Sequence, residues 1–415
     1  MVQGVHLHAQ TELKYAMAAH NSSLPSNETI TPDHVALVQE LNDKMARLMV
    51  PATVYISILM ILGLVGNPMV FYYYGFKTKR TTNTFFLVIL AFYDFIVCVV
   101  SMPTEIADIE LSYTFENNVA CKVLRFLTYF AEFGSMLTLV AIALDRFKKI
   151  CRVTNPQIEI RTAQFISIGI LGIAILLSWP ALVLYGSIQV SIPNTYGIEL
   201  MGADCTSTKD VAYKKYVWAF NGVHFLLFVV LSVVLIVLYS IIGHTIFSLK
   251  KKLRMYKPSK NRTPSSAEVK TSLSDLSQQA DDKMKGNEKG VTKPQTATNT
   301  SKSLFASGNR HSTVSQTSSN AYKKSVIDNV AVKITLVMVV VSTVFIVSFL
   351  PYLSLTVWRV LKGKHEAEFL SDAGLVWFKI GTRSFLLNSS LNPWIYGLAN
   401  SNFRKTFFGM LFKIW

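Results

Sequence analysis

The sequence predicts an all-α membrane protein, a bundle of seven transmembrane helices followed by a short amphipathic helix. Three observations predict this fold class. The chain of 415 residues is 51% hydrophobic and only 16% charged, whereas typical soluble domains are about 25% charged. Seven apolar stretches are long enough to cross a hydrocarbon core, which takes roughly 20 helical residues. Basic and acidic residues also alternate between the loops that join these stretches.

Five of the seven stretches are nearly free of charge: Val50–Phe76, Thr81–Thr104, Thr162–Tyr185, Tyr216–Leu249 and Ile334–Trp358. The other two, Lys122–Leu144 and Gly374–Asn400, are apolar but carry a few charged residues. Buried helices of a large soluble protein would be shorter and would show one polar face. The length and uniformity of these stretches therefore exclude an ordinary soluble core.

The net charge of +16 is a signal of topology. Lys and Arg follow the first, third, fifth and seventh stretches, whereas the alternate loops are acidic. Since positive loops stay in the cytoplasm, we expect a plasma-membrane protein with its N-terminus outside and its C-terminus inside. Residues 250–328 hold 16 Lys and Arg and six Asp and Glu, so this one loop supplies +10 (16 − 6). The basic excess therefore does not indicate nucleic-acid binding.

The expected organisation follows from these assignments. Residues 1–49 form an extracellular tail, 50–249 the first five membrane helices, and 329–400 the last two. The tail has glycosylation sequons at Asn21 and Asn27. Residues 250–328 are rich in Ser, Thr, Lys, Asn and Gln, which predicts a disordered cytoplasmic loop. Residues 401–415 form a membrane-surface helix, with a bilayer-facing stripe that includes Phe403, Phe407 and Phe408.

Charged residues inside a bilayer are costly and so indicate functional sites. Asp94 lies in the middle of the second stretch, within Leu90-Ala91-Phe92-Tyr93-Asp94. Further motifs occur in order, each on its own stretch: Gly66-Asn67, Asp145-Arg146-Phe147, Tyr239, Phe345-x-x-x-Phe349-Leu350-Pro351 and Asn392-Pro393-Trp394-Ile395-Tyr396. With this pattern the chain resembles the rhodopsin-like (class A) G-protein-coupled receptors, and the resemblance covers all seven stretches.

The resemblance implies a receptor that binds an extracellular ligand and activates a heterotrimeric G protein. It assigns the activation switch to residues near the cytoplasmic side and at the helix hinges: Asp145, Arg146, Tyr239, Lys333, Phe345, Phe349, Pro351, Asn392, Pro393 and Tyr396. Two substitutions depart from the family pattern. Phe147 replaces the usual Tyr, and Ala331 stands where an acid often faces the Arg. We therefore expect appreciable basal activity.

The polar residues around Asp94 predict an allosteric Na⁺ site. Its oxygen ligands would come from Asp94, Ser135, Asn388, Ser389 and Asn392, since hard cations favour carboxylate, hydroxyl and amide oxygens. The alternative is a water-filled polar network with Asp94 protonated. The family resemblance favours sodium and also implies a disulfide between Cys121 and Cys205, which would hold the second extracellular loop over the ligand site. No other cofactor is expected.

The ligand is most readily interpreted as a short peptide. Thr128 stands where aminergic receptors carry an Asp, and Leu386 where opsins carry the retinal Lys. Residues of both charges lie in the upper half of the bundle. The expected ligand-binding residues are Glu105, Asp108, Thr128, Tyr129, Glu132, Arg359, Lys379 and Arg383. Such a site suits a ligand of mixed charge, although these residues could equally pair with one another.

Other readings stay open at this level. An amine could bind Glu132, a lipid acid could bind Arg383, and a seven-helix transporter would show internal repeats, of which we find none. No nucleotide-binding loop, metalloprotease helix or nucleophile elbow is present, so we do not expect an enzyme. Residues 401–415 contain few Ser or Thr, and we therefore expect kinases and arrestin to act on the third cytoplasmic loop, 250–328.

Overall fold

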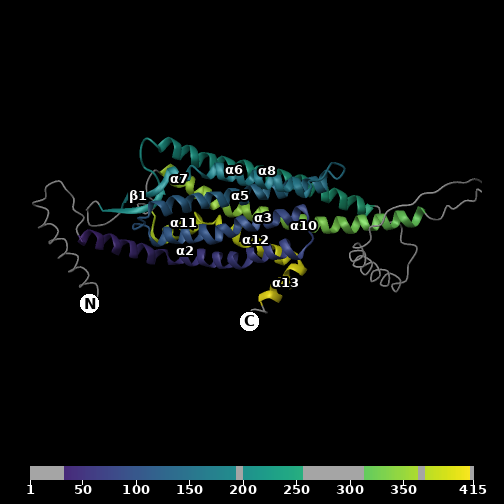
Figure 1. Ribbon diagram of the computed structural model, residues 1–415, viewed down its shortest axis with the longest axis horizontal. Coiled ribbons are helices and arrows are strands. Elements are labelled where there is room, and N and C mark those ends of the chain that lie inside the picture. The colour runs from purple at the N-terminus through teal and green to yellow at the C-terminus, as the bar shows by residue number, and fades with distance from the viewer. Residues whose placement is uncertain (1–31, 193–199, 256–312, 363–369, 412–415) are drawn as a thin grey trace, which may run out of the picture. The chain divides into compact units, whose positions relative to one another are not determined.

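Helices dominate the computed structural model, which describes residues 32–192, 200–255, 313–362 and 370–411 (Figure 1). In chain order the elements are α2 (Pro32–Tyr72), η1 (Tyr73–Lys77), α3 (Thr82–Ile96), η2 (Val97–Ser101), α4 (Met102–Glu110), α5 (Asn118–Cys151), α6 (Ile160–Ser178), α7 (Ala181–Leu184), β1 (Tyr185–Ser191), β2 (Met201–Ser207), α8 (Lys214–Met255), α10 (Thr313–Lys362), α11 (Asp372–Gly381), α12 (Leu386–Ala399) and α13 (Ser401–Leu411). The chain forms two compact units, Met1–Thr245 with Val330–Trp415, and Ile246–Asn329. All candidate site residues belong to the first.

Six helical stretches within the described residues are long and apolar enough to cross a membrane: His34–Lys77, Thr82–Glu110, Asn118–Cys151, Ile160–Leu184, Lys214–Ser248 and Val332–Arg359. They cover the first six expected segments. Two of them begin at side-chain caps that satisfy free backbone N–H groups. The Thr81 and Thr84 side chains form a capping box at α3, and the Asn117 side chain accepts from the Ala120 N–H at α5.

The seventh segment is divided, although we expected one helix over Gly374–Asn400. Helix α11 ends at Gly381, and α12 begins at Leu386. In the turn between them the N–H groups of Arg383 and Ser384 donate to carbonyls three residues earlier, at 3.1 and 3.2 Å. The Ser384 hydroxyl also donates to the Ser348 carbonyl of α10 at 2.6 Å. Cross-helix hydrogen bonding therefore supports the interruption.

The second segment contains a π-helical turn, η2, directly after the helix that carries Asp94. Pro103 follows this turn and has no N–H to donate to the preceding turn. The Thr104 hydroxyl instead donates to the Val100 carbonyl at 2.7 Å. Such π-turns occur often at functional sites, and this one lies between Asp94 and the acids of α4.

Helix α2 begins well before the expected membrane boundary. Residues 32–49, which we assigned to the tail, form its first turns. Leu37 packs here with Tyr113, Ile192 and Leu200. Asn42 ties the helix to the next loop, since its Nδ2 donates to the Glu110 carbonyl at 2.8 Å and its Oδ1 accepts from the Tyr113 N–H at 3.0 Å. The start of α2 therefore braces this end of the bundle.

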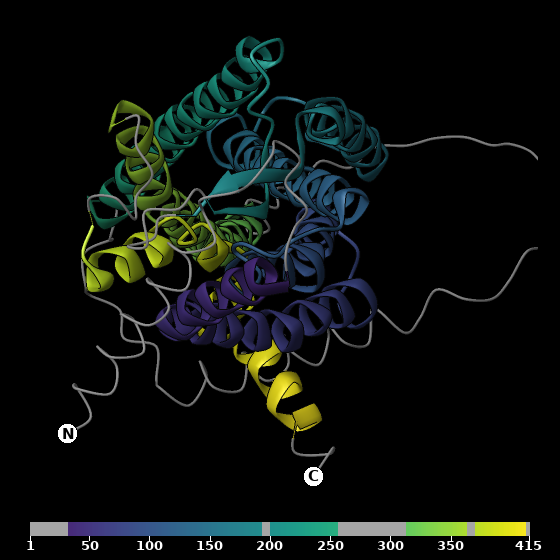
Figure 2. The same cartoon turned by 90° about the vertical axis from the view of Figure 1, so that its left-hand side faces the viewer.

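An antiparallel hairpin lies at the same end. Strands β1 and β2 pair from Tyr185 with Ser207 to Ser191 with Met201. Figure 2 looks onto this end and shows the hairpin lying across the helix ends. Backbone hydrogen bonds join it to the loop between α4 and α5, where the Phe115 N–H donates to the Ala203 carbonyl at 2.9 Å and the Ala203 N–H donates to the Tyr113 carbonyl at 2.8 Å.

Close glycine contacts fix how the helices cross in the interior. A Cβ on Gly134 of α5 would lie 2.1 Å from the Tyr93 ring of α3, and one on Gly66 of α2 would lie 2.7 Å from Pro393 of α12. The outward faces are apolar, with Phe165 74% and Leu176 66% exposed on α6. A chain that buries tight helix contacts and exposes large apolar side chains fits a bilayer.

The helix α13 does not present the aromatic stripe that we expected to face the bilayer. Phe403 and Phe407 are buried. Phe403 stacks on Tyr74 with ring centroids 5.8 Å apart, and Phe407 packs against Trp394 at 5.3 Å. Phe408 is 45% exposed. The aromatic face of α13 thus has protein partners that its sequence alone does not reveal.

Candidate functional site

Four charged side chains form a closed cluster at the β1–β2 end of the bundle, here named the charge quartet: Glu105, Asp108, Arg125 and Arg383. Arg125 of α5 donates from Nη1 to Glu105 Oε1 at 2.7 Å and from Nη2 to Asp108 Oδ1 at 2.6 Å. Arg383 places Nε 2.9 Å from Glu105 Oε2 and donates from Nη2 to Asp108 Oδ2 at 3.1 Å. The charges of the two acids and the two arginines therefore cancel. Three of the expected ligand-binding residues, Glu105, Asp108 and Arg383, thus take part in ion pairs within the bundle, which was the alternative left open by the sequence.

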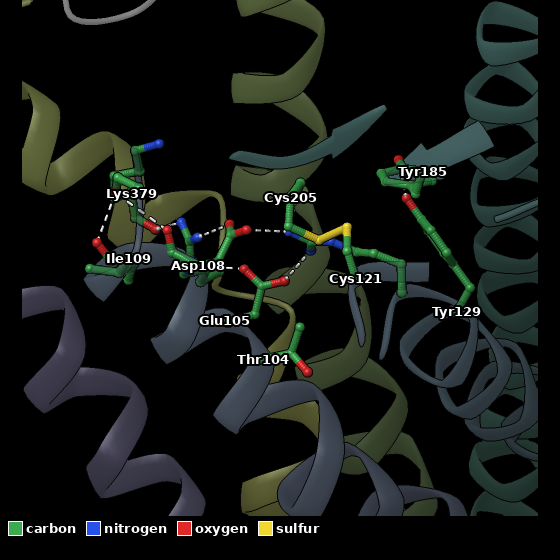
Figure 3. Close-up of polar contacts among 12 residues, drawn as sticks. Thr104, Glu105, Asp108, Ile109, Cys121, Tyr129, Tyr185, Cys205 and Lys379 are labelled. Carbon is green, nitrogen blue, oxygen red and sulfur yellow. Dashed lines mark hydrogen bonds and ion pairs between the residues drawn. A yellow bond between two sulfur atoms is a disulfide. The ribbon is translucent and has the colours of Figure 1, made fainter. Parts of the chain in front are cut away.

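The quartet lies directly beside the Cys121–Cys205 disulfide (Figure 3). This bond joins the first turn of α5 to β2, with Cα atoms 5.5 Å apart, and confirms the expected pairing. Arg125, four residues after Cys121, also donates from Nη2 to the Cys205 carbonyl at 3.2 Å. Among the described cysteines, Cys98 and Cys151 remain free thiols. The disulfide and this hydrogen bond thus join the hairpin to α5, in addition to its backbone hydrogen bonds with the loop between α4 and α5.

Asp204 of β2 adds a further acid beside the disulfide and the quartet. Burial, followed by the charge of Asp108, raises the pKa of Asp204 to about 6, while Lys379 and Arg125 act in the opposite direction. Of the other expected ligand residues, Arg359 is exposed on α10, and the Lys379 carbonyl accepts from Arg383 Nη1 at 3.4 Å. The structure therefore gathers six charged residues near the disulfide, namely the quartet, Asp204 and Lys379.

Aromatic residues line the space between α5, α8 and β1. The Tyr129 and Tyr185 hydroxyls hydrogen-bond at 2.6 Å, and Figure 3 shows this pair on the far side of the disulfide from Lys379. Tyr129 also contacts Phe220 and His224, with ring centroids 5.1 and 4.7 Å away. The expected ligand residue Tyr129 is therefore part of an aromatic cluster, whereas Thr128 beside it is buried with no hydrogen bond to its hydroxyl among the described residues.

The Asp94 carboxylate lies deeper and is fully buried. It accepts three hydrogen bonds from neutral donors: Ser135 Oγ at 2.8 Å, Ser389 Oγ at 2.9 Å and Asn392 Nδ2 at 2.7 Å. The amide oxygens of Asn388 and Asn392 are buried and accept no hydrogen bond from the described residues. Sequence motifs on three separate helices thus meet at one carboxylate.

The opposite end of the bundle carries the Asp145–Arg146 pair. Both side chains are buried, and Arg146 Nη2 contacts Asp145 Oδ2. Lys149, one turn later, donates to the same oxygen at 2.9 Å. Tyr239 lies within electrostatic reach of Arg146, whereas Lys333 is exposed. The side chain of Ala331 lies outside the described residues, as do Asn21 and Asn27.

Aromatic side chains surround Phe349 of α10. Phe349 lies two residues before Pro351 and packs against Phe345, Phe228 and Phe385, with ring centroids 4.8, 5.1 and 5.9 Å away. At the α12 end, Tyr396 is buried and meets Tyr74 edge-on at 6.3 Å. Of the expected switch residues on α10 and α12, five are thus buried, namely Phe345, Phe349, Asn392, Pro393 and Tyr396, whereas Pro351 and Lys333 are exposed.

Sequence reasoning missed two residues of this region. Arg125 is one of the few charged residues of the stretch Lys122–Leu144 and was assigned no role, yet it pairs with both acids of the quartet. Its position seven residues before Glu132, two turns along one helix face, was an available signal. Asn42 was missed because it fell in the supposed tail.

Comparisons with known proteins agree with this architecture. The family described as "7 transmembrane receptor (rhodopsin family)" matches residues 66–396. The C3a anaphylatoxin chemotactic receptor of Oncorhynchus mykiss is 45% identical over 92 residues, 22% of this chain and 25% of that protein. The C5a anaphylatoxin chemotactic receptor 1 of the same species is 30% identical over 146 residues, 34% of this chain and 41% of that protein.

A further relative is the neuropeptide FF receptor 2 of Mus musculus, 30% identical over 162 residues, 38% of each chain. The matched segments span less than half the length of these relatives. The family match, in contrast, runs from the first membrane segment to the seventh. The chain therefore belongs to the rhodopsin family of seven-transmembrane receptors and is not an enzyme.

Proposed function

We propose that this receptor binds an extracellular peptide at the β1–β2 end of the bundle and activates a heterotrimeric G protein at the other end. The assignment of a peptide ligand rests on the relatives, which are named as receptors for anaphylatoxins and a neuropeptide. The charged, hairpin-covered end of the bundle supports it, because peptides offer both charges and backbone groups for recognition.

The orientation belongs to the same proposal. A disulfide persists in an oxidising compartment, which favours an extracellular position for Cys121 and Cys205. The opposite ends of the helices carry the basic clusters, as cytoplasmic ends do. We therefore place the N-terminus outside, with glycans at Asn21 and Asn27, and the C-terminus inside.

Coupling to the G protein would use Arg146. Arg146 and Lys149 both pair with the Asp145 carboxylate at the cytoplasmic end. Release of Arg146 from Asp145 would therefore free its guanidinium for the G protein. Tyr239 and Tyr396 would meet Arg146 in the active state. The buried Phe345 and Phe349, with the hinge at Pro351, would transmit the movement of α10.

Asp94 and its neighbours would hold an allosteric Na⁺. Their donor set fits this ion, because it supplies one buried carboxylate together with hydroxyls and with amide oxygens that lack hydrogen bonds. The residues involved would be Asp94, Ser135, Asn388, Ser389 and Asn392. Bound sodium would neutralise a buried negative charge and so stabilise the resting arrangement.

Kinases and arrestin would act on the third cytoplasmic loop. Residues 256–312 of this loop lie outside the described residues, and the proposal rests on their Ser and Thr content and on the net charge of the loop. Deletion of residues 265–319 should abolish agonist-driven arrestin recruitment and spare G-protein activation. Intact recruitment would contradict this assignment.

A screen of short synthetic peptides against cells that express the receptor with a promiscuous G protein tests the main proposal. We expect at least one peptide to raise the second messenger in these cells and not in cells that express Arg146→Ala at equal surface density. Activation by small amines or lipid acids alone would contradict the peptide assignment. The pairing of Arg383 with Glu105 and Asp108 argues against a lipid acid at that position.

A further inference from the structure

Asp145 carries two cations on a single oxygen. Arg146 Nη2 and Lys149 Nζ both contact Asp145 Oδ2, the lysine at 2.9 Å. The other oxygen, Oδ1, is buried and accepts no hydrogen bond from the described residues. Within this part of the chain, Arg146 and Lys149 are the basic side chains that pair with the carboxylate. If Arg146 leaves Asp145 during coupling, Lys149 is therefore the cation that remains.

The place of Lys149 on α5 keeps it aligned with Asp145 wherever the Arg146 side chain points. Residues four apart on a helix share one face, whereas direct neighbours do not. Lys149 follows Asp145 by four residues near the end of α5, and an acid that precedes a lysine at this spacing is the favourable order. Because the pair lies within one helix, a movement of α10 or of Arg146 toward a partner need not break it.

The burial of Asp145 makes this second cation important. The Asp145 side chain is 1% exposed, whereas that of Lys149 is 29% exposed and reaches it from the rim. Removing one partner of a buried ion pair leaves an uncompensated charge, which is strongly unfavourable. With Lys149 in place, Asp145 keeps a counter-charge after Arg146 departs. The two cations also repel each other at the shared oxygen. Both effects lower the free-energy cost of releasing Arg146.

Lys148 shows that a lysine at the end of this helix does not by itself imply such a role. It precedes Lys149 in the last turn of α5, but it is exposed, and no acid of the described residues pairs with it. The helix dipole and the solvent are enough to explain an exposed basic residue at a helix C-terminus. They do not explain Lys149, whose ammonium contacts a carboxylate that solvent hardly reaches.

We propose that Lys149 is a positioning residue for G-protein coupling, which replaces Arg146 as the counter-ion of Asp145 when Arg146 is released. This inference rests on the proposed function and adds a residue to it. The Asp145 carboxylate then has a cation before and after the release, so the guanidinium of Arg146 becomes available at low cost. The same effect raises basal activity, which is the direction that Ala331 predicts from the sequence.

Nucleotide exchange on a purified G protein, with the receptor in lipid discs, tests the role of Lys149 in coupling. Lys149→Gln should slow exchange about tenfold, both without ligand and with a saturating peptide from the screen, within the range for coupled charges. Lys149→Arg should restore the rate to within about twofold, because it keeps the charge. Lys148→Gln is the matched control and should leave the rate unchanged.

The same exchange assay in an Asp145→Asn background separates a counter-ion from a direct contact with the G protein. Without the carboxylate no counter-charge is needed, so adding Lys149→Gln to Asp145→Asn should change the rate by less than about twofold. A tenfold loss that persists in this background would mean that Lys149 acts on the G protein itself, and it would overturn the proposal. An unchanged rate in Lys149→Gln alone would do the same.

A stability measurement needs neither ligand nor G protein, so it separates the failure of this inference from the failure of the proposed function. In Arg146→Ala, Asp145 depends on Lys149 alone. Adding Lys149→Gln should therefore lower the unfolding temperature about three times as much in Arg146→Ala as in the wild type, and hardly at all in Asp145→Asn. Arg146→Gln replaces the alanine variant if that variant does not reach the cell surface.

The outcomes of this measurement point in different directions. Equal drops in the wild type and in Arg146→Ala would contradict the counter-ion role of Lys149 even if peptides drive nucleotide exchange. The expected pattern of drops, without any peptide-driven exchange, would support the counter-ion role and reject the proposed function.

Discussion

The Asp94 site and the charge quartet stabilise acids in the same bundle by opposite means. Asp94 is fully buried, and its partners are three neutral donors on α5 and α12. Glu105 and Asp108, a few turns away along the second segment, are held by two arginines from α5 and the turn before α12. The Asp94 carboxyl therefore has no basic side chain as a partner among the described residues, whereas the charges of the quartet cancel one another.

This difference assigns different work to the two regions. A closed set of ion pairs ties α4, α5 and the α11–α12 turn together, and breaking it leaves buried charges unpaired. A carboxylate with neutral donors can gain or lose a small cation with little rearrangement. The ion pairs of the quartet thus join these elements below the hairpin, and we propose that Asp94 is the site that responds to a small cation.

Removing Arg125 should produce the largest effect. Arg125→Ala leaves Glu105 and Asp108 with one arginine and removes the hydrogen bond to Cys205, which should cost about 3–5 kcal/mol of stability. Thermal unfolding of the detergent-solubilised protein and surface density report the loss. Arg152→Ala, at an exposed position after α5, should change stability by less than about 0.5 kcal/mol. Similar behaviour of the two variants would mean that the quartet is not a structural tie.

A methyl group at Gly134 should disturb the packing of α3 against α5 beside the Asp94 site. Its Cβ would lie 2.1–2.4 Å from Tyr93 ring atoms, so Gly134→Ala must displace α3 or α5 next to Ser135. Overpacking of this kind costs about 1–3 kcal/mol. Gly172→Ala is the matched control, because no atom lies within 4 Å of its new Cβ. Thermal unfolding should show a loss for the first variant only; equal stability would refute the close helix contact.

Sodium should stabilise the protein through Asp94 and not through the quartet. At ten times its dissociation constant, bound Na⁺ adds about 1.4 kcal/mol. The unfolding temperature of the wild type should therefore rise when NaCl replaces N-methylglucamine chloride at constant ionic strength. Asp94→Asn should lose this shift. Asp108→Asn should keep the shift, although its unfolding temperature without sodium should be lower than that of the wild type. A shift that survives in Asp94→Asn would indicate that sodium binds elsewhere.

The pH dependence at the rim of the quartet should be the smallest effect. The pKa of Asp204 is about 6 in the folded chain, above its ordinary value of 3.8. The folded state therefore binds more protons than the unfolded state between about pH 4 and 6, and the stability contributed by this group falls as the pH rises through that window. Asp204→Asn should remove this slope and raise the stability at neutral pH.

Unfolding curves from pH 4 to 7.5 measure this slope. Glu116→Gln serves as the control, because the side chain is exposed and the slope should persist. The opposite result would be a wild-type stability that rises between pH 4 and 6 and no longer rises in Asp204→Asn. That slope would have the wrong sign and would contradict a raised pKa for Asp204.

The membrane segments were predictable because their signal is local. Length and hydropathy identified six spans that the helices cover, and the seventh was found although it is interrupted at 382–385. Asp94 and Asn392 could be assigned to one site because each stands in a motif with a fixed place on its helix. Their hydrogen bond at 2.7 Å agrees with that placement.

The quartet and the aromatic face of α13 could not be predicted in the same way. The contact between Arg125 and Glu105 depends on how α4 and α5 are rotated about their axes, which hydropathy does not define. Phe403 fits a bilayer or Tyr74 equally well by pattern, and tertiary packing decides between them. The first turns of α2 were missed because Leu37 packs against residues of two loops, a contact that hydropathy does not reveal.

Ligand-dependent nucleotide exchange on a purified G protein, with the receptor reconstituted in lipid discs, tests the central claim most directly. We predict that a peptide from the screen accelerates exchange with the wild-type receptor. Arg146→Ala should bind the same peptide without accelerating exchange. Acceleration that persists in Arg146→Ala would contradict the assigned coupling site, and the absence of any peptide-dependent exchange with folded wild-type receptor would contradict the proposed function.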